Sequence, residues 1–115
     1  MVGKAKNKTK EDERRFQLLQ EVGCLPCRMM GLGHQYGDVH HILHAGRRQT
    51  HQHTIVLCKW HHVGAEPGYS DKICREHKGP SLAKEKREFY NQFGSEEELL
   101  EATNKALKIV EESFI

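Results

Sequence analysis

The fold of this chain is decided by residues 38–62, which read Asp38-Val-His-His-Ile42, then a polar turn, then His51-Gln-His-Thr-Ile-Val-Leu-Cys-Lys-Trp-His-His62. The apolar runs Ile42-Leu43 and Ile55-Val56-Leu57 predict two short buried strands, joined by residues 45–50. A helix is expected to begin close to His62, directly after the second strand. Two strands followed by a helix in so short a stretch predict a small α+β domain.

Two pairs of metal-ligating residues with the same spacing enclose these strands. Cys24-x-x-Cys27 precedes the first strand, and Cys58-x-x-His61 follows the second. A gap of two residues lets both side chains of a pair face one ion, and two such pairs in one chain are typical of structural zinc. We therefore predict a zinc-stabilised core with these four residues as ligands.

A third pair, Cys74-x-x-His77, has the same spacing but no partner pair elsewhere in the sequence. It is a candidate for an additional metal site. The alternative, favoured by the missing partner pair, is a free thiol beside an exposed histidine.

The composition predicts one small domain with a thin apolar core. The chain has 115 residues, of which 37% are hydrophobic and 30% are charged. A core of this kind commonly depends on a metal or on disulfides. We see no apolar signal segment and no run long enough to cross a membrane, so we expect the cytoplasm of a bacterial host cell, where cysteines stay reduced and available to metal. The net charge of +2 is too small to indicate nucleic-acid binding by itself.

Positive charge is instead concentrated in residues 1–10, which carry Lys4, Lys6, Lys8 and Lys10 and no acidic residue. This composition predicts a disordered basic arm. The arm is either a solubilising tail or a contact to DNA phosphates. We expect residues 11–115 to form a single domain, with its core at about residues 22–64 and its C-terminal helices within residues 81–112.

Capping patterns predict where the flanking helices begin. Thr9 followed by Asp12 or Glu13 can cap the first helix, and Ser95 with Glu98 is a capping box for the last. Between them, Ser81 is the predicted cap of a further helix whose aromatic stripe should pack into the core.

The adjacent pair His40-His41 lies at the predicted first strand. Neighbouring side chains on a strand point to opposite faces, so the two cannot share one task in the usual way. One can bind a metal while the other acts on a separate group beside it. His51 is expected to be exposed.

The pattern Cys-x-x-Cys, His40-His41-Ile42 and Cys-x-x-His61-His62 resembles the HNH, or ββα-metal, endonuclease superfamily. Further matches at Gly46-Arg47, at His51-x-His53 and at Phe89, five residues before Gly94, resemble one branch of it, the phage recombination-enhancement (Ref) nucleases. The resemblance covers about residues 22–100. It implies a ββα-metal core with flanking N- and C-terminal helices.

The resemblance also implies a role for each histidine. His40 and His62 match the ligands of a catalytic divalent ion, and His41 matches the general base. His53 stands at the middle position and would orient His41 or the scissile phosphate. The implied ion is Mg²⁺ or Mn²⁺, with Zn²⁺ or Ni²⁺ as alternatives because imidazole ligands suit those ions as well.

The expected partners are DNA and, by the resemblance, a RecA-type recombinase filament, with no membrane. Arg47, in the turn between the strands, is the candidate phosphate clamp, since a guanidinium grips two oxygens at once. Arg48 and the lysines of the arm are further candidate DNA contacts.

The sequence thus predicts a metal-dependent DNA endonuclease that hydrolyses phosphodiester bonds by a one-metal HNH mechanism, acting in phage or prophage recombination or repair. The alternative is a non-catalytic, zinc-stabilised DNA-binding or adaptor module. His41 divides the two, because its main value is proton transfer, which a binding module does not need.

Overall fold

The computed structural model describes residues 8–44, 47–48 and 50–113, with the side chains of residues 43, 44, 47 and 48 left out of the description. Lys4 and Lys6 therefore lie outside the described residues, as do the side chains of Arg47 and Arg48. Within the described part, six helices and two small two-stranded sheets form an α+β fold.

The central sheet pairs β1 (Asp38–His41) with β4 (Thr54–Leu57) in antiparallel register, with His40 opposite Ile55. The second predicted strand is confirmed, and all of β4 is buried. The first strand begins earlier than the apolar pair Ile42-Leu43 suggested. β1 forms there because it pairs with β4. One more backbone hydrogen bond follows directly after β1, from the amide of Ile42 to the carbonyl of His53 at 2.9 Å.

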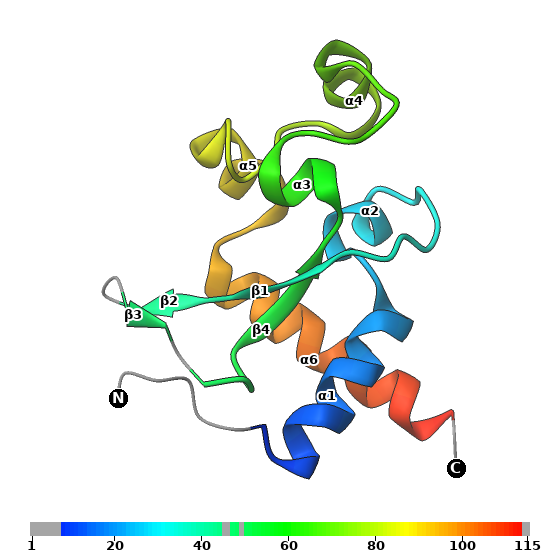
Figure 1. The fold of residues 1–115 in the computed structure, drawn as a ribbon, viewed down its shortest axis with the longest axis vertical. Helices are drawn as coiled ribbons and strands as arrows, with labels where there is room; N and C mark the ends of the chain where they lie inside the picture. Colours follow the sequence, from blue (N-terminus) through cyan, green and yellow to red (C-terminus); the bar gives the residue numbers. More distant parts are fainter. Residues whose placement is uncertain (1–7, 45–46, 49, 114–115) are drawn as a thin grey trace.

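Two further strands, β2 (Leu43–His44) and β3 (Arg47–Arg48), form a short antiparallel ribbon beyond the end of β1. After β4 the chain turns directly into α3 (Lys59–Val63), so β1, β4 and α3 lie together (Figure 1).

One side of the sheet is covered by α1 (Lys10–Val22) and α6 (Glu96–Glu112), which lie side by side (Figure 1). Both predicted capping boxes are confirmed, that of Thr9 with Asp12 and that of Ser95 with Glu98. These boxes form because each side chain satisfies an amide that the first helical turn leaves without a partner. The core on this side is made by Leu18, Leu19, Val22, Val56, Ala106 and Leu107.

Gly23 is the C-cap of α1, in a backbone conformation that favours glycine. Its φ of 77° lies in the left-handed region, and a Cβ there would stand 2.8 Å from the carbonyl oxygen of Gln35. The chain can therefore turn sharply from α1 into α2 (Leu25–Met29).

The other core joins the sheet to α5 (Lys86–Phe93) and the start of α6, and consists of Leu25, Ile42, Ile55, Leu57, Leu82, Phe89, Phe93 and Leu99. The predicted aromatic stripe is confirmed as core, since Phe89 and Phe93 are buried. The helix expected to start at Ser81 begins only at Lys86, because the Ser81 hydroxyl instead closes a turn by accepting from the amide of Lys84.

The remaining helix, α4 (Asp71–Lys78), lies at the far end of the molecule from the N-terminus of α1 (Figure 1). Its cap is Ser70, whose side chain accepts from the amide of Ile73. In the part of the chain that the structure describes, no helix has the length and apolar character needed to span a membrane.

Candidate metal centres

The first centre is a buried cluster of Cys24, Cys27, Cys58 and His61. Both pairs are built alike. Cys24 is the N-cap of α2 with Cys27 in the first turn, and Cys58 is the N-cap of α3 with His61 in the first turn. Two helix N-termini thus converge on the cluster, and their free amides favour the thiolate form of cysteine.

Four of the separations between ligand atoms match a tetrahedral zinc site, and all four ligand atoms lie within 4.8 Å of one another. Zinc bonds of ~2.3 Å to sulfur and ~2.0 Å to nitrogen place two sulfurs about 3.8 Å apart, and a sulfur and a nitrogen about 3.5 Å apart. The Sγ atoms of Cys27 and Cys58 are 3.7 Å apart, and Nδ1 of His61 lies 3.3–3.5 Å from the three sulfurs. The cluster could therefore hold a structural metal ion such as zinc.

Hydrogen bonding assigns the nitrogen with which His61 would bind. Its Nε2 lies 2.8 Å from the carbonyl oxygen of Lys78. A carbonyl only accepts, so Nε2 carries the proton and Nδ1 presents its lone pair to the sulfurs.

Hydrogen bonds among the three thiols favour the thiolate of one cysteine, Cys58, while they raise the pKa of Cys24. Hydrogen bonds from the thiols of Cys24 and Cys27 lower the pKa of Cys58, so Cys58 is the first of the three to ionise. The ammonium of Lys78 lies 3.8 Å from Cys58 Sγ and 2.8 Å from a carboxylate oxygen of Glu66. Burial opposes the charge on Lys78, but Glu66 and the neighbouring thiolates outweigh it and raise its pKa. Three thiolates and one Zn²⁺ carry one net negative charge, which Lys78 is placed to balance.

A second group of polar side chains lies between β1 and α3, where the rings of His40 and His62 pack edge to face with centroids 5.2 Å apart. Asp38 occupies the same face of β1 as His40 and lies 3.1 Å from Nδ1 of His62. The hydrogen bond from His62 lowers the pKa of Asp38, with Lys59 adding to the effect. Because an ionised carboxylate only accepts, Nδ1 of His62 is the donor, and in a neutral imidazole Nε2 then holds the lone pair.

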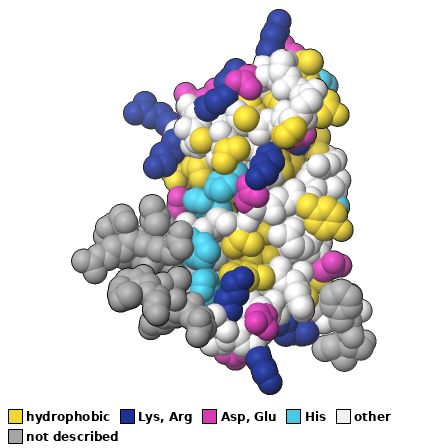
Figure 2. Space-filling model, viewed as in Figure 1, with side chains coloured by type: hydrophobic (Ala, Val, Ile, Leu, Met, Phe, Trp, Pro, Cys, Tyr) yellow, Lys and Arg dark blue, Asp and Glu magenta, His cyan; other side chains and the backbone are white. Residues whose placement is uncertain are grey.

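His40 is the least exposed of these three side chains, and its Nε2 is a buried polar atom without a hydrogen-bond partner among the described residues. Burial lowers the pKa of His40, with the nearby His62 acting in the same direction. The imidazole is therefore neutral near neutral pH, which is the form that binds metals. Figure 2 shows several histidine side chains gathered on one face, with acidic side chains near them.

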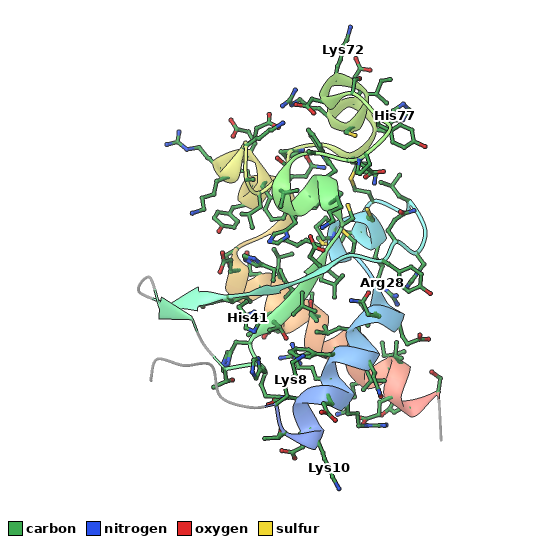
Figure 3. All side chains as sticks on the ribbon, in the orientation of Figure 1. Lys8, Lys10, Arg28, His41, Lys72 and His77 are labelled. Carbon is green, nitrogen blue, oxygen red and sulfur yellow. The ribbon has the colours of Figure 1, made fainter. Side chains whose placement is uncertain are left out.

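His41 leaves β1 on the opposite face from His40, as the alternation of a strand predicts. Its Nε2 lies 3.1 Å from Nδ1 of His51, and the His51 ring packs edge to face on Phe16 of α1. His51 is thus partly buried, and the expectation that it is exposed was wrong. The turn that precedes β4 folds back toward α1, and Gln52 fixes it there by donating to Asp12 at 2.8 Å. Lys8 and His41 line one open groove on this side, and Figure 3 shows both.

The other predicted residues are distributed around these groups. His53 shares a hydrogen bond of 2.9 Å with the hydroxyl of Thr50. Cys74 is buried against the cysteine cluster and Trp60, whereas His77 is exposed and lies on α4, far from His41 (Figure 3). The structure therefore turns these two members of the third pair in different directions. Lys10 is exposed at the start of α1.

Sequence reasoning missed three neighbours of the second group: Asp38, Tyr90 and Glu96. Asp38 had a readable signal, because it stands two residues before His40 and a strand repeats its faces every second residue. Glu96 lies with an oxygen 3.8 Å from His40 Nε2, and Tyr90 donates to that same oxygen at 2.8 Å. Both come from distant helices, and only the fold brings them to β1.

The fold and the sites define a small α+β protein with two neighbouring polar groups. One is the buried Cys₃His cluster, and the other is a group of histidines and a carboxylate that includes His62, the residue after His61 in α3. A family model described as recombination enhancement, RecA-dependent nuclease matches residues 8–108. The chain belongs to this family, which agrees with the Ref branch that the sequence pattern resembles. The family description indicates a nuclease that acts in recombination.

Proposed function

We propose that the protein is a metal-dependent DNA endonuclease of the HNH type, in which His40 and His62 hold one catalytic divalent ion. One observation carries this proposal. Nε2 of His40 is buried without a hydrogen-bond partner among the described residues, and it stands beside His62, whose Nδ1 is held by Asp38. A cation would supply the partner that His40 lacks.

The residues present fit such an ion. Two neutral imidazoles offer lone pairs, and the Asp38 carboxylate orients His62 in the way that second-sphere carboxylates orient metal-binding histidines. When bound, a divalent ion here would supply positive charge to the phosphate oxygens and the leaving oxygen of the scissile bond.

His41 is the proposed general base. One proton lies between its Nε2 and Nδ1 of His51. We propose that a ring nitrogen of His41 accepts the proton of the attacking water, and that the contact with His51 orients the His41 ring. His51 then acts as a positioning residue, and its own ring is braced on Phe16.

The remaining assignments concern the grip on DNA. His53, held to Thr50, would position the turn before β4 or contact the scissile phosphate. Arg47 is proposed as the phosphate clamp, with Arg48 and the lysines at positions 4, 6, 8 and 10 as further phosphate contacts. Lys8 reaches over the Phe16 ring at 4.8 Å, which places one of these lysines on the side where His41 lies.

Membership in the family supports a RecA-type filament as the partner that presents the DNA. As the setting we propose phage or prophage recombination in the bacterial cytoplasm. The Cys₃His cluster is proposed to hold zinc as a purely structural ion.

The test is cleavage of two substrates, a supercoiled plasmid and a duplex paired with a RecA-coated single strand, with Mg²⁺ or Mn²⁺. We expect the wild type to cut and His41→Ala to cut about 10²–10⁴-fold more slowly, the usual value of a general base. His77→Ala is the matched control, since His77 is an exposed histidine on α4. If the wild type binds DNA but cuts neither substrate with either metal, the non-catalytic module is the better account.

A further inference from the structure

We propose that Glu96 is a third ligand of the divalent ion held by His40 and His62, and that Tyr90 is the positioning residue for Glu96. This inference rests on the proposed function and adds a carboxylate from α6 to a site otherwise made by β1 and α3.

The first support is a close approach of two polar atoms that form no hydrogen bond with each other. Nε2 of His40 and Oε1 of Glu96 face each other at 3.8 Å. That separation is too long for a hydrogen bond, so neither atom satisfies the other. Both side chains are shielded, with exposed fractions of 18% for His40 and 20% for Glu96. A cation between the two side chains would give the buried nitrogen of His40 a partner and would be bound by the half-buried carboxylate as well.

The second support is that Glu96 is held in place from outside the pair. The hydroxyl of Tyr90 donates to Oε1 at 2.8 Å, and this is the same oxygen that faces His40. A phenol is protonated at neutral pH, so the Tyr90 hydroxyl is the donor and the carboxylate is the acceptor. A carboxylate oxygen has room for both a phenol and a metal ion, because it carries two lone pairs.

The separation also suits shared coordination. Two ligand atoms bound to one ion at ~2.1 Å stand about 3.0–3.5 Å apart in octahedral or tetrahedral geometry. From 3.8 Å, His40 and Glu96 need to approach by about 0.3–0.8 Å, which side-chain rotation can supply.

The third ligand affects which divalent ion the site prefers. Two imidazoles alone favour Zn²⁺, Ni²⁺ or Cu²⁺, whereas a carboxylate brings the hard oxygen and the negative charge that Mg²⁺ and Mn²⁺ prefer. We therefore assign the site to a divalent ion of the Mg²⁺ and Mn²⁺ class.

The experiment is a Mn²⁺ titration of the zinc-loaded protein, followed by electron paramagnetic resonance of the free ion. Glu96→Gln is compared with Glu97→Gln, which removes the same charge from the next residue of α6, at an exposed position. We expect Glu96→Gln to raise the Kd for Mn²⁺ at least 10-fold and Glu97→Gln to leave it within 2-fold of the wild type. Tyr90→Phe should give a smaller rise, and Glu96→Asp should restore part of the affinity.

Equal Kd values in Glu96→Gln and Glu97→Gln overturn this inference. If the wild type still binds Mn²⁺ and cuts DNA in that case, the proposed function stands with His40 and His62 alone. If the wild type neither binds Mn²⁺ nor cuts, the proposed function fails and the role of Glu96 fails with it. Thermal melts of the two variants check that both are folded.

Discussion

His61 and His62 are neighbours in α3, yet they face different groups. His61 presents Nδ1 to three cysteine sulfurs, and His62 packs against His40 of β1. Successive residues on a helix point about 100° apart, so one short helix can serve two centres. In each histidine the nitrogen that does not face the centre is fixed by an oxygen acceptor, the carbonyl of Lys78 or the carboxylate of Asp38.

Asp38→Asn tests the second of these contacts. The amide keeps the size of the carboxylate but loses its charge, so it holds the His62 tautomer less firmly. Loss of such an outer partner typically costs about 10–100-fold in metal affinity or activity. We expect a loss of this size in Mn²⁺ affinity by titration, with the zinc content unchanged. Mn²⁺ affinity equal to that of the wild type would show that Asp38 serves only Lys59.

The sequence alone could predict a centre where its residues lie close together along the chain. The Cys₃His set was readable because each pair lies within one turn of chain. Only the resemblance to a known family assigned His40 and His62 to one site. His51 and Glu96 were not readable, since one depends on how a turn folds back on α1 and the other on a helix that arrives from far along the chain.

The helices show the same division between local and distant causes. The capping boxes of α1 and α6 were predicted correctly because both partners lie three residues apart. The start of α5 was predicted too early, at Ser81. Ser81 is fully buried, and the amide of its neighbour Leu82 donates to the carbonyl of His61 at 2.9 Å. A tertiary contact thus holds that segment as a turn, and capping propensity alone could not reveal it.

Ser95→Ala tests how much the cap of α6 matters to the fold. The serine hydroxyl accepts from the amide of Glu98 at 3.1 Å, and removing such a cap typically costs about 1 kcal/mol. We expect the free energy of unfolding in urea to fall by that amount. Glu97→Ala, at an exposed position in the same turn, is the control and should change it by less than about 0.5 kcal/mol.

The cap of α1 predicts a dependence on pH. Hydrogen bonds from Gln52, and then from the amide of Thr9, lower the pKa of Asp12 below its ordinary value of 3.8. A carboxyl with a depressed folded pKa contributes stability that is complete above its unfolded pKa and is lost as the pH falls through the folded value. The stability advantage of the wild type over Asp12→Asn should therefore be constant near neutral pH and shrink below about pH 4. Thermal melts across this range measure it, and an advantage that does not change with pH would contradict the assignment.

The molecule as a whole has two apolar cores, one on each side of a two-stranded sheet, and the cysteine cluster joins α2 to α3 beside them. Structural zinc contributes on the order of 10 kcal/mol to folding, comparable with the entire stability of about 5–15 kcal/mol of a typical domain. We therefore expect the fold to depend on an ion bound by the cysteine cluster.

Removal of zinc by a chelator should unfold the protein. Trp60, the only tryptophan, is fully buried beside the cluster, so its emission should shift to the red as helical circular dichroism is lost. Cys27→Ala should behave like the chelated protein. Cys74→Ala is the control and should keep its zinc, because Cys74 lies outside the four-ligand set. A chelated protein that keeps its helical signal and its melting temperature would show that the two cores suffice.

The central claim is that one helix serves two metals, a structural ion through His61 and a catalytic ion through His62. The most direct measurement is metal content by native mass spectrometry of the zinc-loaded protein, with and without Mn²⁺, for the wild type and His62→Ala. We predict one zinc and one manganese in the wild type, and one zinc and no manganese in His62→Ala, with DNA cleavage lost in the variant. Equal manganese binding in the two proteins would contradict the account.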